Sequence, residues 1–198
     1  MADYAEVLGK VLRGEYDDAS PEERDGAVRA LVNLCSAAAA AVAFQPIPFV
    51  DVALISPIQV GMVQGIARVY GHKLDQRSIM EILSTFGASL VAQNVLMAAA
   101  KFVPVLGWLA AVSMAYATTW AIGEVSDHYF RNGRGVPADE LRSMFQRTYQ
   151  QKRSEKEKQH RADDTLKRRL DQLKEAHAAG LIDDEELRVK KEQILKDF

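Results

Sequence analysis

The stretch "PIPFVDVALISPIQVGMVQGIARVYG", residues 46–71, decides the fold of this chain. It holds three prolines, three glycines and two charged residues in an otherwise apolar run. Pro46 and Pro48 end a preceding helix, because proline lacks the backbone N–H and pushes the residue before it away from helical angles. The apolar content that follows requires burial. The pattern therefore predicts a packing helix over residues 49–71.

Within this predicted helix, Pro57 indicates a kink, unless two short helices meet at Ser56. Gly71 suits the glycine position that commonly follows a helix. Gly61 and Gly65 form a Gly-xxx-Gly pair, which in lipid would mark a tight helix dimer. In a bundle the same pair makes a smooth groove where another helix crosses, and we favour that interpretation.

The two charged residues of this stretch, Asp51 and Arg68, allow two interpretations. Isolated charges in an apolar segment can form a buried polar pocket or a partner site. They can also be a carboxylate at the positive end of a helix and an arginine that extends its head group to water. We favour the second interpretation and keep both residues as helix-packing or partner candidates, together with Pro57, Gly61 and Gly65.

The rest of the chain also reads as helix, because it shows no sustained alternation and no hairpin turn between apolar runs. Ser20, Pro21 and Glu23 form a capping box that predicts a helix start. Four long apolar helices joined by short connectors favour an all-α, Ala/Gly-rich antiparallel bundle with a kinked proline-containing helix. The expected helices cover residues 2–12, 21–44, 49–71, about 75–103, 108–130 and a long charged segment from 137.

Charge divides the chain sharply. Residues 34–123 hold seven charged side chains, whereas residues 137–198 hold 29, of which 15 are basic. The first segment can bury itself almost anywhere, and the second can bury very little. We therefore expect an N-terminal helix and linker (1–20), a bundle (21–133), a charged helix or linker (137–164) and a small helical hairpin (165–198).

The predicted C-terminal hairpin has its own signals. Gly180 ends its first helix, and Asp183 with Glu186 can cap the second. The hairpin is too small to bury much surface alone, which favours self-association or docking of a partner protein. The candidate oligomerisation residues are Leu166, Leu170, Leu173, Leu181, Ile182, Leu187, Ile194 and Leu195.

Composition and spacing give no case for an enzyme. The net charge of −2 and the balanced charges of the C-terminal part argue against nucleic-acid binding. Cys35 is the only cysteine, which excludes an intramolecular disulfide, and it reads as a small buried apolar residue. No two histidines share the i,i+3 or i,i+4 spacing of a metal-ligand pair. We therefore expect no catalytic, cofactor-binding or metal-binding residue; the histidines are His72, His128, His160 and His177.

Membrane insertion is an open alternative. Residues 82–100 and 102–123 carry no charge and approach spanning length. Their serine, threonine, asparagine and glutamine content and many alanines disfavour insertion, as does a polar stripe at i+4 spacing from Arg77 to Gln93. We favour a water-soluble bundle in the cytoplasm with possible peripheral membrane contact, since no signal peptide is recognisable. The alternatives are an integral hairpin over residues 82–123 and a bundle that binds an apolar small molecule or lipid.

Residues 30–133 contain a series of short motifs that runs from Pro46-Ile47-Pro48 through Pro57-Ile58-Gln59 to Gly133. With these motifs, this part of the chain resembles the bacterial YcjF-like domain of unknown function. The resemblance implies an all-helical, often membrane-associated module without an established activity, commonly fused behind a small GTPase domain. This chain has no phosphate-binding loop, so a GTPase could act only in trans. The matching residues are Pro46-Ile47-Pro48, Asp51, Pro57-Ile58-Gln59, Met62, Ile66-Ala67, Tyr70-Gly71, Pro104, Gly107-Trp108, Thr118, Ile122-Gly123, Tyr129-Phe130 and Gly133.

The end of the chain carries leucines at positions 170 and 173 followed by Gly180-Leu181-Ile182. In this pattern it is similar to the short C-terminal helical motif called SHOCT, which implies an attachment or oligomerisation element. Together these observations predict a non-enzymatic helical adaptor or scaffold. The residues that carry this second resemblance are Leu170, Leu173, Gly180-Leu181-Ile182, Glu185-Glu186, Lys190-Lys191 and Leu195.

Overall fold

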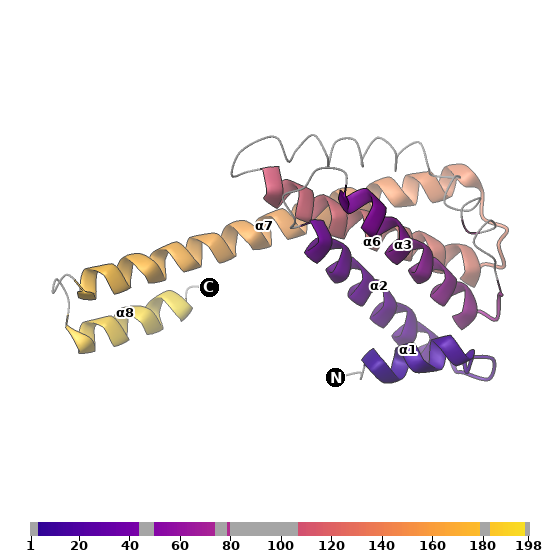
Figure 1. Cartoon of the computed structure of the whole chain (residues 1–198), viewed down its shortest axis with the longest axis horizontal. Coiled ribbons are helices and arrows are strands. Elements are labelled where there is room, and N and C mark those ends of the chain that lie inside the picture. The colour runs from indigo at the N-terminus through magenta and orange to yellow at the C-terminus, as the bar shows by residue number, and fades with distance from the viewer. Residues whose placement is uncertain (1–3, 44–49, 74–78, 80–106, 179–182, 197–198) are drawn as a thin grey trace. The chain divides into compact units, whose positions relative to one another are not determined.

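The computed structural model describes residues 4–43, 50–73, 79, 107–178 and 183–196. These residues form six helices and no strand, which confirms the predicted all-α fold. The third long helix predicted from about residue 75, with its polar stripe, lies outside them except for Ile79, which is buried. The helices are α1 (Tyr4–Arg13), α2 (Pro21–Ala43), α3 (Val50–Val69), α6 (Gly107–Arg131), α7 (Ala138–Ala178) and α8 (Asp184–Lys196) (Figure 1).

The chain divides into two compact units, Met1–Lys156 and Glu157–Phe198. Helix α7 contributes to both, because it runs without interruption across the boundary. Its central charged stretch, which could have been a linker, is therefore helical, as the sequence favoured. The predicted limits of the domains stay a prediction, and the two units are described separately below.

In the first unit, α2, α3 and α6 pack against one another, and α1 packs against α2 and α3 (Figure 1). Side-chain contacts give the directions. Asp25, early in α2, contacts Arg131 at the end of α6, so these two helices are antiparallel. Tyr70, just after α3, contacts Asp127 near the end of α6, so α3 and α6 are parallel. The sequential pair α2 and α3 is consequently antiparallel, as predicted.

Two clusters of buried apolar side chains form the interior of this unit. The larger one contains bulky residues such as Leu31, Ile66 and Ile122 from the three central helices. The smaller cluster joins the end of α2 to the beginnings of α3 and α6, and four of its seven residues are alanines. Small side chains let helices approach closely, so this end is built for close packing. The smaller cluster consists of Ala39, Ala43, Ile55, Ala111, Val112, Met114 and Ala115.

The first part of α7 belongs to the larger cluster. Leu141, Phe145 and Tyr149 are all buried there, and their i,i+4 spacing places them on one face of the helix. Farther along, the ammonium of Lys152 lies 4.6 Å from the centre of the Trp120 ring, and that of Lys156 lies 4.7 Å from the Tyr116 ring. These cation–π contacts extend the pairing of α7 with α6.

Three helices end in the same way. At the end of α3, the N–H of Gly71 donates to the carbonyl of Arg68 at 2.9 Å, and the N–H of His72 donates to that of Ala67 at 2.8 Å. This pair of bonds is the Schellman motif, which needs a left-handed residue after the helix. Gly71 has φ of +75°, and Gly14 after α1 and Gly133 after α6 have φ of +74° and +66°. The predicted stop at Gly71 is confirmed.

Both predicted capping boxes are also confirmed. The Glu23 N–H donates to Ser20 Oγ at 3.2 Å, and the Ser20 N–H donates to Glu23 Oε2 at 2.8 Å. At the start of α8, the Glu186 N–H donates to Asp183 Oδ1 at 2.8 Å, and the Asp183 N–H donates to Glu186 Oε2 at 3.2 Å. Each box satisfies two backbone donors that the first helical turn leaves without partners.

Pro57 lies inside one continuous helix, because α3 runs from Val50 to Val69. The alternative of two short helices meeting at Ser56 is therefore wrong. Pro57 is exposed on the outside of the unit. Pro57 has no N–H to donate to the carbonyl of Ala53, four residues earlier. That carbonyl consequently lies on a side of the helix that water can reach.

Candidate functional site

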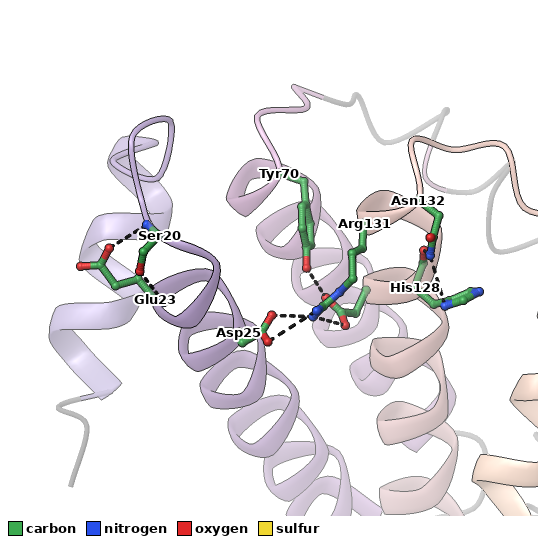
Figure 2. Close-up of polar contacts among 8 residues, drawn as sticks. Ser20, Glu23, Asp25, Tyr70, His128, Arg131 and Asn132 are labelled. Carbon is green, nitrogen blue, oxygen red and sulfur yellow. Dashed lines mark hydrogen bonds and ion pairs between the residues drawn. The ribbon is translucent and has the colours of Figure 1, made fainter.

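A polar cluster joins the three central helices at the end of the bundle where α2 begins and α3 and α6 end (Figure 2). The Tyr70 hydroxyl donates to Asp127 Oδ1 at 2.6 Å. Arg131 Nη2 donates to Asp127 Oδ2 at 2.9 Å and to Asp25 Oδ1 at 2.5 Å. Four side chains from three helices therefore form one connected network.

The contacts of this network favour the protonated forms of Tyr70 and Arg131. Burial and the hydrogen bond to the Asp127 carboxylate raise the pKa of Tyr70 well above its ordinary value. Desolvation opposes the charged form of Arg131, but its hydrogen bond to Asp25 and the charge of Asp127 outweigh that effect and raise its pKa. Tyr70 and Arg131 therefore keep their protons throughout the physiological range. Such groups can hold helices together, but they are poorly suited to proton transfer.

Replacing Tyr70 with phenylalanine is expected to lower the free energy of unfolding by about 1 kcal/mol, because one partly buried hydrogen bond is lost. Arg131 still satisfies Asp127 in the variant, so the loss stays modest. Urea unfolding measures the effect. Tyr129→Phe is the matched control, since the Tyr129 hydroxyl forms no hydrogen bond with a described residue. Equal losses in the two variants would show that the network adds nothing to stability.

A second polar contact closes the turn between α6 and α7. His128 Nε2 lies 3.0 Å from Glu140 Oε1. The Asn132 amide donates to the His128 carbonyl at 2.7 Å and lies 3.3 Å from His128 Nδ1 (Figure 2). His128 thus links two helices at an exposed position, and its closest carboxylate is not the Glu124 or Asp127 of its own helix.

The predicted candidates Asp51 and Arg68 do not meet. They lie 17 positions apart on one helix, which places them about 25 Å apart along its axis. Arg68 is half-buried and lines an open pocket of about 700 Å³ beside Arg13 and Lys73. Arg13 and Arg68 stand in the last turns of α1 and α3, where a positive charge complements the helix dipole. The two residues therefore do not share one pocket, and their role in helix packing or partner binding stays a prediction.

The two glycines of the Gly-xxx-Gly pair have different surroundings. A methyl group on Gly65 would lie 3.1 Å from a methyl of Leu31 and 3.4 Å from one of Val11. A methyl group on Gly61 would meet nothing within 4 Å. Of this pair, only Gly65 is a place of close helix approach within the bundle.

Among the glycines whose surroundings the structure describes, the closest approach is at Gly123, which sequence reasoning did not single out as a packing residue. A methyl group on Gly123 would lie 2.5 Å from one methyl of Val32 and 3.1 Å from the other. Gly123 therefore sets the distance between α6 and α2. The only signal in the sequence was its place in the Ile122-Gly123 pair of the family resemblance.

Reactive groups are few in the part of the chain that the structure describes. No three of its histidine, cysteine, aspartate and glutamate side chains gather as a metal site would require. Burial raises the pKa of Cys35 to about 11, so its thiol stays protonated and unreactive at neutral pH. Cys35 is half-buried, less than predicted, and packs against the larger apolar cluster as a small apolar residue.

In the second unit, α8 follows the last part of α7. His177 Nε2 lies 2.8 Å from Asp184 Oδ1, linking the two helices. The predicted oligomerisation residues on α7, Leu166, Leu170 and Leu173, are half-buried. On α8, Leu187 and Ile194 are half-buried and Leu195 is exposed. Leu181 and Ile182 lie outside the described residues.

Comparison with known proteins places the chain in a family. It is 29% identical over 124 residues to the magnetosome membrane protein 22 of Magnetospirillum gryphiswaldense, a match that covers 57% of this chain. The chain spans 64% of the length of that curated relative. No solved structure matches. The profile of the domain of unknown function DUF697 matches residues 9–175, and the chain therefore belongs to the DUF697 family.

Proposed function

We propose that this protein is a non-enzymatic helical scaffold that associates with a membrane and uses its C-terminal helices for self-association or for docking a partner protein. The observation that carries the proposal is the contrast between the two units. The first has a large apolar interior, made of two clusters of buried side chains. In the second, no described side chain is buried.

The exposure of apolar side chains in the C-terminal unit supports the proposed self-association or partner docking. Five of its predicted oligomerisation residues are only half-buried and a sixth is exposed. A two-helix unit of this size cannot remove its leucines from water alone. Pairing with a second molecule would bury them, and the mixed charges around them would keep the unpaired form in solution.

Two observations support membrane association. The relative described above is named as a membrane protein. Within the described residues, α2 has the length and composition of a spanning helix, although 44% of its most apolar window is buried inside the structure. Since core helices also pass this test, peripheral contact is the form that we propose.

The alternative of an integral hairpin over residues 82–123 has less support. Its first part lies outside the described residues. In its second part, Ala111, Ala115 and Ile122 are almost completely buried within the bundle. A lipid-spanning α6 would have to give up those contacts. A GTPase acting in trans stays a prediction that rests on the family resemblance alone.

Light scattering after size-exclusion chromatography tests the association role. The wild-type chain is expected to show the mass of two or more chains, each of 21.9 kDa. Leu170→Gln combined with Leu173→Gln is expected to return it to the single-chain mass, because the shared apolar face is lost. Gln172→Ala, at an exposed position between them, is the control. A variant with the wild-type mass, or a wild type that is monomeric, would contradict self-association.

A further inference from the structure

An open pocket of about 700 Å³ lies where the ends of α1 and α3 meet. The turn after each helix passes through a glycine in the left-handed region, Gly14 with φ of +74° and Gly71 with φ of +75°. A methyl group on Gly71 would lie 3.8 Å from Asp17 Oδ1, whereas one on Gly14 would meet nothing within 4 Å. The two turns therefore approach each other, and their glycines leave the space beside them open.

The charged side chains that line this pocket are mainly basic. Arg13, Arg68 and Lys73 carry three positive charges, and Asp17 carries the one negative charge of the lining. Arg13 is paired with Glu15. Arg68 and Lys73 form no ion pair and no side-chain hydrogen bond with another residue that the structure describes. The charges of these two residues are therefore available to a ligand.

The C-terminal ends of two helices would normally disfavour an anion, because their free carbonyls carry partial negative charge. Here the turns use several of those carbonyls. After α1, the Gly14 N–H donates to the Val11 carbonyl at 3.2 Å, and the Glu15 N–H donates to the Lys10 carbonyl at 3.0 Å. The end of α3 has the Schellman bonds described above. These bonds weaken the repulsion that an anion in the pocket would meet.

Most acidic side chains of the same region face a different opening. A second groove of about 730 Å³ lies between α1 and the start of α2, and four of the acidic residues that line it do not line the basic pocket. Since basic and acidic surfaces are neighbours here, attraction to a broadly negative surface is weak. The basic pocket can still recognise one negative group at close range, because charges interact most strongly over a few ångströms. The four acidic residues are Glu6, Glu15, Asp18 and Glu23.

A phosphate group matches the donors of the basic pocket. The planar guanidinium of Arg68 can donate two hydrogen bonds to phosphate oxygens, and the ammonium of Lys73 adds a compact charge. Leu12 also lines the pocket, and its side chain is 71% exposed. An exposed leucine beside cationic side chains gives the rim an apolar surface, which the glycerol and acyl part of a phospholipid can contact.

We propose that the pocket between the ends of α1 and α3 binds a phosphate group, held by Arg68 and Lys73 with Arg13 as a third cation. Two sources offer this group, the phosphomonoester head of a phospholipid and phosphate free in solution. In its lipid form the inference rests on the membrane association proposed above and names the surface that performs it. All of these residues belong to the first unit.

Vesicle flotation tests the lipid source. The wild type is expected to bind vesicles that contain phosphatidic acid, whose phosphate is a monoester, more tightly than vesicles of phosphatidylcholine alone. Arg68→Gln is expected to weaken this binding about tenfold, because charged hydrogen bonds to the phosphate are lost. Arg29→Gln is the matched control, since it removes the same charge from an exposed position on α2 outside the pocket. Its binding should equal that of the wild type.

Titration calorimetry with inorganic phosphate tests the free source on the same variants. Circular dichroism verifies that Arg68→Gln is folded, and Lys73→Gln, at an exposed position after the helix, makes the same test if it is not. Leu12→Gln separates the two sources, because it removes apolar surface and no charge. It should weaken binding to the phosphatidic acid vesicles and leave the affinity for inorganic phosphate unchanged. Leu54→Gln, at another exposed leucine, is its control.

The outcomes separate this inference from the membrane association. Binding of either ligand that is weakened in Arg68→Gln and kept in Arg29→Gln is the result that we expect. Equal weakening in these two variants would mean attraction to overall charge and would overturn the site, as would a wild type that binds neither ligand. Vesicle binding that Arg68→Gln and Lys73→Gln both leave intact, without binding of inorganic phosphate, would overturn the site and keep membrane association.

Discussion

Replacing Phe145 with alanine is expected to lower the free energy of unfolding by about 3 to 5 kcal/mol, the usual cost of deleting a buried phenylalanine side chain. Phe145 is completely buried, and its ring stacks on Tyr149 with centres 6.3 Å apart. The residue lies in the most charged part of the chain, yet it belongs to the main apolar cluster. Urea denaturation followed by circular dichroism measures the loss.

Arg147→Ala is the control, because Arg147 is exposed on the same helix two positions later. Its effect should stay within about 0.5 kcal/mol. A loss below about 1 kcal/mol for Phe145→Ala would contradict the assignment of the first part of α7 to the interior of the first unit. In that case, a chain truncated before α7 would keep its folded bundle. The structure predicts the opposite, namely that removal of all of α7 unfolds the bundle.

Gly123→Ala is expected to cost about 2 kcal/mol through overpacking. The new methyl group would lie 2.5 Å from Val32, whose own exposure is 3%. Valine in a helix has essentially one side-chain rotamer, so it cannot turn aside, and α2 and α6 must separate instead. The higher helix propensity of alanine offsets only part of this cost.

Gly61→Ala is the matched control for Gly123→Ala. It makes the same change inside a helix, but nothing lies within 4 Å of the added methyl group. Stability should rise by about 0.5 to 1 kcal/mol, because the unfolded chain loses freedom without a clash. Similar changes in stability for Gly61→Ala and Gly123→Ala would refute the close approach of α2 and α6 at Gly123. As a further check, Val32→Ala should cost less in the Gly123→Ala background than in the wild type.

Local features of the fold could be predicted from the sequence. The Ser20 and Asp183 capping boxes and the stop at Gly71 depend on residues within one turn of each other. Their hydrogen bonds form almost wherever these residues occur in this order. The helix starts and ends derived from them agree with the structure to within one or two residues.

Features that join distant parts of the chain could not be predicted in this way. Asp25 and Arg131 are 106 positions apart, and the sequence around either residue gives no sign that the two form a contact. The glycine pair at 61 and 65 has a recognisable spacing, but spacing does not say which glycine faces a neighbour. Leu141, Phe145 and Tyr149 do have the spacing of a buried face, which the surrounding charges concealed.

The three glycines that follow helices have a consequence for how the sequence can drift over evolutionary time. Gly14, Gly71 and Gly133 hold left-handed backbone angles, which cost most other residues about 1 kcal/mol or more. Gly135 has ordinary angles and open space around it. Point mutations should therefore accumulate at position 135 and be removed at the other three. The turns at these three glycines would then be among the slowest positions to change.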